Sequence, residues 1–153
     1  MPGLRPVQRA GVQPVRVRHD TTARGAYVLA EPEEVGLKKK PQAVIIATGS
    51  EVQLALHAQT ELARLKIAVR VVSMPSTTVF DRQDAAYKAE VLPAGLPRVA
   101  IEAGVTDFWW KYGCAAVLGI DSYGESAPAG VLFKHFHFTT ENLVATVRKV
   151  LGR

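Results

Sequence analysis

The run Ala43-Val-Ile-Ile-Ala-Thr48 indicates the class of fold. A continuous apolar run rich in β-branched residues is typical of a strand buried on both faces. Gly49 and Ser50 break the run, and apolar residues at helical spacing then continue to Leu65. Ser50 and Gln53 match a capping box, so we expect a helix to begin there. A buried strand that leads into an amphipathic helix is the unit of an α/β sheet.

Strand and helix patterns continue to alternate along the chain. Further strands are predicted over Ile67–Met74, Arg98–Ala103 and Ala115–Ile120. Helices are predicted over Asp81–Leu92, Thr106–Tyr112 and Ser126–Phe136 and after the N-cap Thr139. Tyr27–Leu29 precedes a loop rather than a helix, which favours an antiparallel edge strand. The sequence therefore predicts an α/β fold: a three-layer open sheet of mostly parallel strands, with one antiparallel edge strand and helices on both faces.

The N-terminal segment differs from the rest in composition. Residues 1–20 hold four arginines against one aspartate, and three prolines and two glycines interrupt them. We predict a disordered leader or linker remnant over residues 1–22 and one folded domain over residues 23–153. Outside residues 1–20 there are 15 basic and 13 acidic residues, so the body is nearly neutral. This balance argues against a nucleic-acid partner, which requires a cationic face with aromatic side chains.

Two further features bear on the compartment. No apolar run approaches the roughly 20 residues that cross a bilayer, and the N-terminus lacks an apolar signal core, so we expect no membrane partner. The single cysteine, Cys114, cannot form an internal disulfide. A reducing cytoplasm is therefore the expected location.

The sequence offers no recognisable catalytic or metal-binding motif. His57, His135 and His137 lie on different predicted elements, with no cysteine or acidic partner at ligand spacing. A P-loop and a nucleophile elbow are also missing from the sequence. We therefore expect no catalytic, cofactor-binding or metal-binding residue in this chain.

A candidate anion or small-ligand pocket lies at Gly49 and Ser50. Ligands of open parallel sheets bind beyond the carboxyl ends of the strands, where helix N-termini present free N–H groups. Ser73–Thr78 and Glu102–Asp107 occupy comparable places. The structural alternative, which is favoured, is that Ser50 caps its helix while Glu51 interacts with the helix dipole. Glu51 would also repel an anion at this point.

The aromatic residues Trp109, Trp110 and Tyr112 form a candidate interface. The adjacent residues Trp109 and Trp110 cannot both face one side of a helix. We expect one to enter the core and the other to face a subunit or another domain. A role in the core alone is left equally open.

Nine motifs, in register, resemble the C-terminal domain of transketolases. They are Arg24–Leu29 (RGAYVL), Ile45–Val52 (IIATGSEV), Val71–Ser76 (VVSMPS), Phe80–Tyr87 (FDRQDAAY), Val91–Pro93 (VLP), Val99–Gly104 (VAIEAG), Trp110–Tyr112 (WKY), Gly124–Ala129 (GESAPA) and Phe138–Asn142 (FTTEN). Together they cover about residues 23–152. The resemblance implies a mixed sheet of mostly parallel strands flanked by helices.

The resemblance also implies a functional setting. Transketolases are homodimers that use thiamine diphosphate and a divalent metal, usually magnesium, to move a two-carbon ketol unit between sugar phosphates. Their C-terminal domain contributes to packing and supplies no established cofactor ligand. We therefore expect the remaining transketolase domains or subunit as partners, a weak homodimer, and no catalysis by this chain alone. Dihydroxyacetone synthase shares the domain, so the resemblance leaves that enzyme open.

Two departures from the family pattern stand out. Residues 1–22 do not resemble the arginine motif that precedes the domain, and His137 stands where the family commonly has glycine. If that position has a positive φ, histidine adds strain of about 1 kcal/mol. An alternative is a stand-alone regulatory module of the same fold that binds a small ligand or anion.

Overall fold

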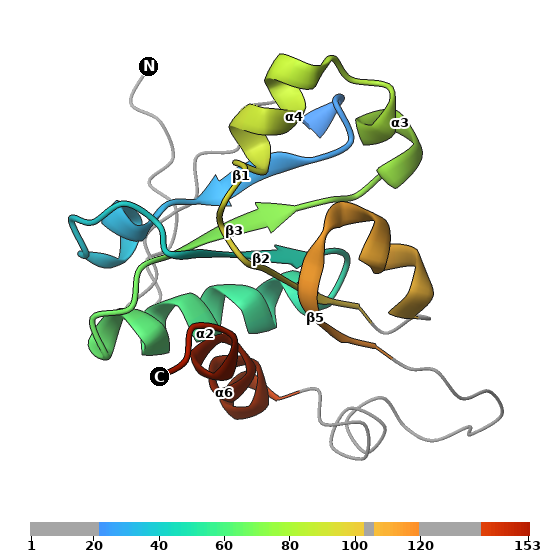
Figure 1. Ribbon diagram of the computed structural model, residues 1–153. Helices are drawn as coiled ribbons and strands as arrows, with labels where there is room; N and C mark the ends of the chain where they lie inside the picture. The colour runs from blue at the N-terminus through green and yellow to red at the C-terminus, as the bar shows by residue number, and fades with distance from the viewer. Residues whose placement is uncertain (1–21, 103–105, 120–138) are drawn as a thin grey trace, which may run out of the picture.

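The computed structural model describes residues 22–102, 106–119 and 139–153 and contains a five-stranded sheet (Figure 1). The strands are β1 (Tyr27–Ala30), β2 (Ala43–Ala47), β3 (Val69–Ser73), β4 (Arg98–Ile101) and β5 (Cys114–Leu118). Their order across the sheet is β1-β3-β2-β4-β5. β1 runs antiparallel to β3 at one edge, and the other neighbouring pairs are parallel. The predicted sheet with its antiparallel edge strand is confirmed.

Helices cover both faces of the sheet, so the predicted three layers are also confirmed. The helices α2 (Glu51–Arg64) and α6 (Thr140–Val150) lie side by side on one face, below the sheet in Figure 1. On the other face lie α3 (Thr77–Asp81), α4 (Ala85–Val91) and the 3-10 helix η2 (Thr106–Tyr112). A second 3-10 helix, η1 (Pro32–Val35), follows β1.

The central strand β2 is buried on both faces, as its unbroken apolar run predicts. Ala43, Ile45 and Ala47 pack in one core cluster with α2 and α6. Val44 and Ile46 point to the opposite face and pack in a second cluster with α3, α4 and η2. Full burial of one such branched side chain contributes about 1.5–3 kcal/mol. Two cores that share one strand therefore hold the three layers together.

One predicted helix is wrong in its extent. The stretch Asp81–Leu92 is not a single helix, because α3 ends at Asp81 and α4 begins only after Asp84. The Oδ1 atom of Asp84 accepts a hydrogen bond from the Tyr87 backbone N–H at 2.7 Å, which makes Asp84 an N-cap. This cap sets the start of α4.

The predicted cap of the last helix is confirmed. Thr139 has an extended backbone, and its Oγ1 accepts a hydrogen bond from the Asn142 N–H at 3.1 Å. Several predictions fall outside the described residues. They are the helix Ser126–Phe136, the histidines His135 and His137, and all of the leader except residue 22. Within the part of the chain that the structure describes, no helix is long and apolar enough to cross a membrane.

Candidate functional site

The structure places Gly49 and Ser50 at the carboxyl end of β2, but the predicted capping box is wrong. Ser50 already has a helical backbone (φ −67°, ψ −21°), and among the described residues its hydroxyl caps no backbone N–H. That hydroxyl instead donates to the Glu51 Oε1 at 2.8 Å. The N–H groups of Glu51 and Val52 donate to the carbonyls of Thr48 and Gly49 at 3.2 and 3.4 Å. The turn therefore satisfies these donors without the serine.

Acidic side chains stand around this end of the sheet. Glu51 is only 4% exposed. Ile101 pairs with Ala47 across β4 and β2, and Glu102 follows Ile101 directly. The Oε2 of Glu102 accepts a hydrogen bond from Trp109 Nε1 at 2.5 Å. An anion at Gly49 and Ser50 would meet the Glu51 carboxylate, so this turn is electrostatically unsuited to it. Ligand binding at Gly49 and Ser50 stays a prediction.

The two adjacent tryptophans face opposite ways, as their adjacency predicts. Trp109 is 1% exposed and packs in the core cluster with Phe80 and Tyr87, whereas Trp110 is 49% exposed. Tyr112 is buried, and its hydroxyl donates to Asp81 Oδ1 at 2.8 Å. Of the three residues in the predicted interface, only Trp110 is exposed, and the interface itself stays a prediction.

Two arginines hold the C-terminal end of α4. Arg70 and Arg98 lie on β3 and β4 and pair in register with the same residue of β2, Val44, from either side. Arg70 donates to the carbonyls of Glu90 and Val91 at 2.7 and 3.2 Å. Arg98 donates to the carbonyls of Tyr112, Leu92 and Pro93 at 2.6, 2.9 and 3.3 Å. The last carbonyls of a helix lack intrahelical partners, and the helix dipole favours cations there. We call Arg70 and Arg98 the arginine clamp.

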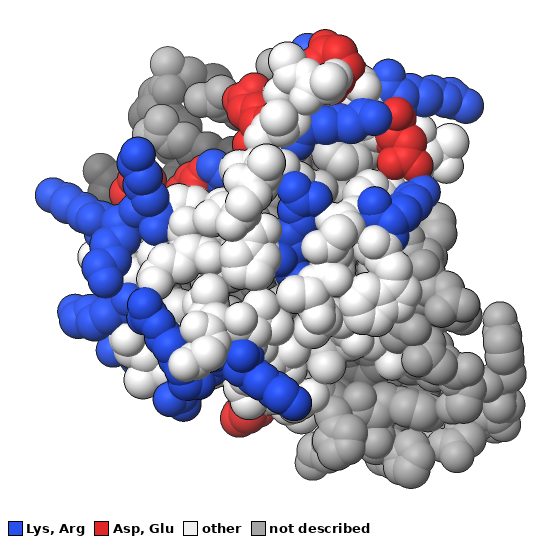
Figure 2. Space-filling model, viewed as in Figure 1, with Lys and Arg blue, Asp and Glu red and all other residues white. Residues whose placement is uncertain are grey.

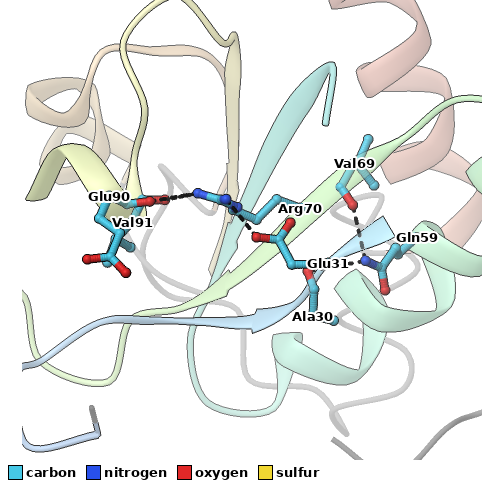
Figure 3. Close-up of polar contacts among 7 residues, drawn as sticks. All are labelled: Ala30, Glu31, Gln59, Val69, Arg70, Glu90 and Val91. Carbon is cyan, nitrogen blue, oxygen red and sulfur yellow. Dashed lines mark hydrogen bonds and ion pairs between the residues drawn. The ribbon is translucent and has the colours of Figure 1, made fainter. Parts of the chain in front are cut away.

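The two halves of the arginine clamp differ in their charge balance. Arg70 pairs with Glu31, whose Oε1 lies 2.6 Å from Arg70 Nη2 (Figure 3). Nearby, the buried Gln59 amide donates to the carbonyls of Ala30 and Val69 at 3.3 and 3.1 Å. Arg98 makes no ion pair with a carboxylate in the described parts of the chain. Within residues 22–102, 106–119 and 139–153, its hydrogen-bond partners are carbonyl dipoles.

Arg98 also borders a hollow of about 360 Å³ that the sequence does not predict. Its lining comes from α3, α4, β4, η2 and the turn after α4: Phe80, Asp81, Lys88, Ala89, Leu92, Arg98, Lys111 and Tyr112. We call it the α4–η2 hollow. In Figure 2 basic side chains lie in the middle of the displayed face, between the positions of α4 and η2 in Figure 1.

Asp81 is the single acidic residue of this lining. Its Oδ2 lies 2.7 Å from Lys111 Nζ, and its Oδ1 accepts the Tyr112 hydroxyl. The hydrogen bond from Lys111, followed by that from Tyr112, lowers the pKa of Asp81. Burial and the neighbouring Asp81 raise the pKa of Tyr112. Asp81 is therefore ionised and Tyr112 protonated at neutral pH.

The remaining titratable candidates do not form a reaction centre. Burial raises the pKa of the Cys114 thiol to about 11, although the Arg98 charge acts against this rise. A thiol with such a pKa is a poor nucleophile at neutral pH. No three His, Cys, Asp or Glu side chains lie together as a metal site within residues 22–102, 106–119 and 139–153. His57 lies on α2 and is the only histidine among the described residues.

Comparison with known proteins gives consistent matches. Residues 25–139 match the family described as the transketolase-like C-terminal domain. Over 133 residues the chain is 52% identical to transketolase 1 of Vibrio cholerae. The matched region covers 85% of this chain and 19% of the Vibrio protein. The chain therefore spans about a fifth of the length of the curated relatives it matches.

Solved structures give the same result. The transketolase of Leishmania mexicana superposes with a TM-score of 0.78 at 40% identity, over 91% of this chain and 20% of that one. A structure titled as the inactive beta4 tetramer of a split-gene transketolase superposes with a TM-score of 0.63 at 26% identity. That match covers 94% of this chain and 48% of the other.

Proposed function

The chain belongs to the transketolase-like C-terminal domain family, and from this premise we propose that it is the C-terminal packing domain of a transketolase. Its role is to pack against the other domains and subunit of that enzyme. The complete enzyme transfers a two-carbon ketol unit between sugar phosphates, with thiamine diphosphate and magnesium as cofactors. We further propose a cytoplasmic location, which agrees with the single, buried cysteine.

The residues that the structure describes do not fit the cofactors. The described side chains offer no set of three metal ligands. The helix start at Ser50 is bordered by the buried Glu51 carboxylate, which opposes a diphosphate. We therefore assign the cofactors to other domains of the enzyme and expect no turnover from this chain alone. The similarity to a split-gene transketolase described as an inactive tetramer supports this expectation.

The observation that carries the packing role is the exposure of Trp110. The same short 3-10 helix buries Trp109 and Tyr112, so its backbone is fixed while the Trp110 ring stays half-exposed. Tryptophan is enriched among residues that contribute most to binding, because a rigid ring buries a large area at little cost in conformational entropy. We propose that Trp110 docks against another transketolase domain or subunit.

A binding experiment tests the packing role. The chain is titrated against Vibrio cholerae transketolase truncated before its C-terminal domain, after thiamine diphosphate binding has shown that the truncated enzyme is folded. We expect saturable binding that weakens at least about tenfold in Trp110→Gln. Leu65→Gln is the matched control, because Leu65 is equally exposed at 50% but lies at the end of α2 on the other face. No binding to a folded partner, or equal losses in both variants, would overturn the proposal.

The activity of the chain is tested separately. A preparation free of host transketolase receives thiamine diphosphate, magnesium and sugar phosphates, and ketol transfer is followed. We expect none, and measurable turnover would contradict the assignment of catalysis to other domains. The acceptor preference of the complete enzyme would distinguish transketolase from dihydroxyacetone synthase.

A further inference from the structure

The lining of the α4–η2 hollow combines an apolar surface with an excess of positive charge. The exposed Ala89 and small accessible parts of Leu92 and Tyr112 supply its apolar surface, whereas Phe80 is only 1% exposed. Three cations, Lys88, Arg98 and Lys111, stand against the single carboxylate of Asp81, which gives a formal balance of +2. An apolar cavity with a few convergent charged groups is the usual composition of a small-molecule site.

The positive charge of the hollow is built into the fold. Arg98 donates to three carbonyls at 2.6, 2.9 and 3.3 Å, which fix its guanidinium beside the hollow. It is the half of the arginine clamp that has no acidic partner among the described residues. Its charge faces an opening whose walls exclude part of the solvent, and there it is screened less than on an open surface.

Asp81 does not remove this excess. It lies within reach of Lys111 and Tyr112, and both contacts keep it charged at neutral pH. Lys88 also approaches Asp81 closely enough to lower its pKa, yet it makes no ion pair within the described parts of the chain. Asp81 interacts with Lys111 and Lys88 but not with Arg98, so the described lining of the hollow keeps a formal excess of two positive charges.

From this lining we propose that the α4–η2 hollow binds a small organic anion, a phosphate or carboxylate group attached to an apolar or aromatic body. The charged group lies near Lys88 and Arg98, and the apolar body lies against Ala89 and the accessible edge of Leu92. The volume of about 360 Å³ falls at the small end of the range for ligand pockets and exceeds what a bare phosphate ion fills. This site is separate from the proposed packing role of Trp110 and from the Gly49–Ser50 turn.

Two substitutions with opposite expected effects separate ligand binding from a purely structural role. Lys88→Gln removes one cation from the rim and should weaken anion binding about two- to fivefold, as expected for a partly exposed charge. Asp81→Asn keeps an acceptor for the Tyr112 hydroxyl but removes the competing negative charge. It should tighten anion binding by a similar factor, whereas a purely structural role for Asp81 gives no reason for tighter binding.

The test is an NMR titration of the whole 153-residue chain with phenyl phosphate, inorganic phosphate and phenol. We expect saturable shifts of Phe80, Leu92 and Tyr112 resonances with phenyl phosphate, weaker binding of inorganic phosphate at the same residues, and no saturation with phenol. Lys149→Gln, an exposed α6 residue, makes the same change in net charge and should leave the affinity unchanged. Melting temperatures show whether each variant is folded.

Three results would overturn the proposal. The first is the absence of saturable phenyl phosphate binding to the folded wild-type chain in the millimolar range. The second is an equal effect of Lys88→Gln and Lys149→Gln, which would mean general charge attraction. The third is unchanged or weaker binding in folded Asp81→Asn. None of these results bears on Trp110, so the packing role is judged by its own experiment.

Discussion

Gly25 is the position at which one methyl group should damage this fold most. Its φ of +87° lies in the left-handed region that glycine tolerates and other residues rarely adopt. A Cβ added at Gly25 would come closer than 3.0 Å to the backbone of Ser76 and of Phe80, a separation that real Cβ atoms essentially never show. The Ser76 N–H also donates to the Gly25 carbonyl at 3.0 Å, so the two segments cannot separate freely.

The expected cost of Gly25→Ala has two parts. The left-handed conformation costs alanine about 1–2 kcal/mol. Forcing a methyl group into packed backbone costs about 1–3 kcal/mol more. The sum, about 2–5 kcal/mol, is a large share of the 5–15 kcal/mol by which typical domains are stable. The neighbouring contacts raise the local cost, because Arg24 lies 4.4 Å from the centre of the Tyr87 ring and the Tyr87 hydroxyl donates to the Ala26 carbonyl.

Gly36→Ala is the matched control. Gly36 has nearly the same φ, +81°, but an added Cβ would meet nothing within 4 Å. Urea unfolding followed by circular dichroism gives the free energy of unfolding of both variants. We expect Gly36→Ala to lose only the backbone part, about 1–2 kcal/mol, and Gly25→Ala to lose about 1–3 kcal/mol beyond that. Equal losses in the two variants would refute the packing argument.

Three further predictions follow from the same structure. The pKa of Asp81 is lowered in the fold, so its contribution to stability is fully present above the unfolded pKa of about 3.9 and is lost as the pH falls through the lower folded value. Asp81→Asn should therefore lower the free energy of unfolding in urea by at most about 0.5 kcal/mol at pH 7. A difference between the two proteins that persists at about pH 2 would contradict this reasoning. Cys114 should react with a disulfide reagent at about pH 8 roughly 100-fold more slowly in the folded chain than in the unfolded chain, because its pKa rises to about 11 in the fold. Comparable rates would show that the thiol is accessible. Sedimentation velocity should show a weak, concentration-dependent dimer of the chain. Trp110→Gln should abolish this dimer and Leu65→Gln should preserve it. A strictly monomeric wild type at millimolar concentration would argue against a dimer contact through Trp110.

The sheet could be predicted because its signals are local. The β2 run is apolar at every position, and burial on both faces follows from that pattern alone. The residue type and place of Thr139 predict that it caps α6, and it does so. The capping box at Ser50 failed because its residue types fit while the backbone does not: a serine already in helical conformation cannot direct its hydroxyl to the third N–H.

The α4–η2 hollow could not be predicted from the sequence, because its chemistry depends on long-range contacts. Asp81 and Lys111 are 30 residues apart, and nothing near either one in the sequence indicates the other. The adjacency of Trp109 and Trp110 predicts that they face opposite ways, but not which one is buried. Trp109 packs in a core cluster with residues far away in the sequence, and its Nε1 donates to Glu102, so the choice depends on long-range contacts.

The charge distribution of the folded chain explains why the two candidate ligand sites differ. At the carboxyl end of β2 and β4, Glu51 and Glu102 place negative charge where open sheets usually bind anions. At the opposite end, the arginine clamp needs cations, because the last carbonyls of α4 would otherwise be unpaired. Glu31 balances Arg70, whereas the described residues supply no carboxylate for Arg98. The structural need of one helix end therefore leaves net positive charge beside the α4–η2 hollow, which is why we propose an anion site there rather than at Gly49 and Ser50.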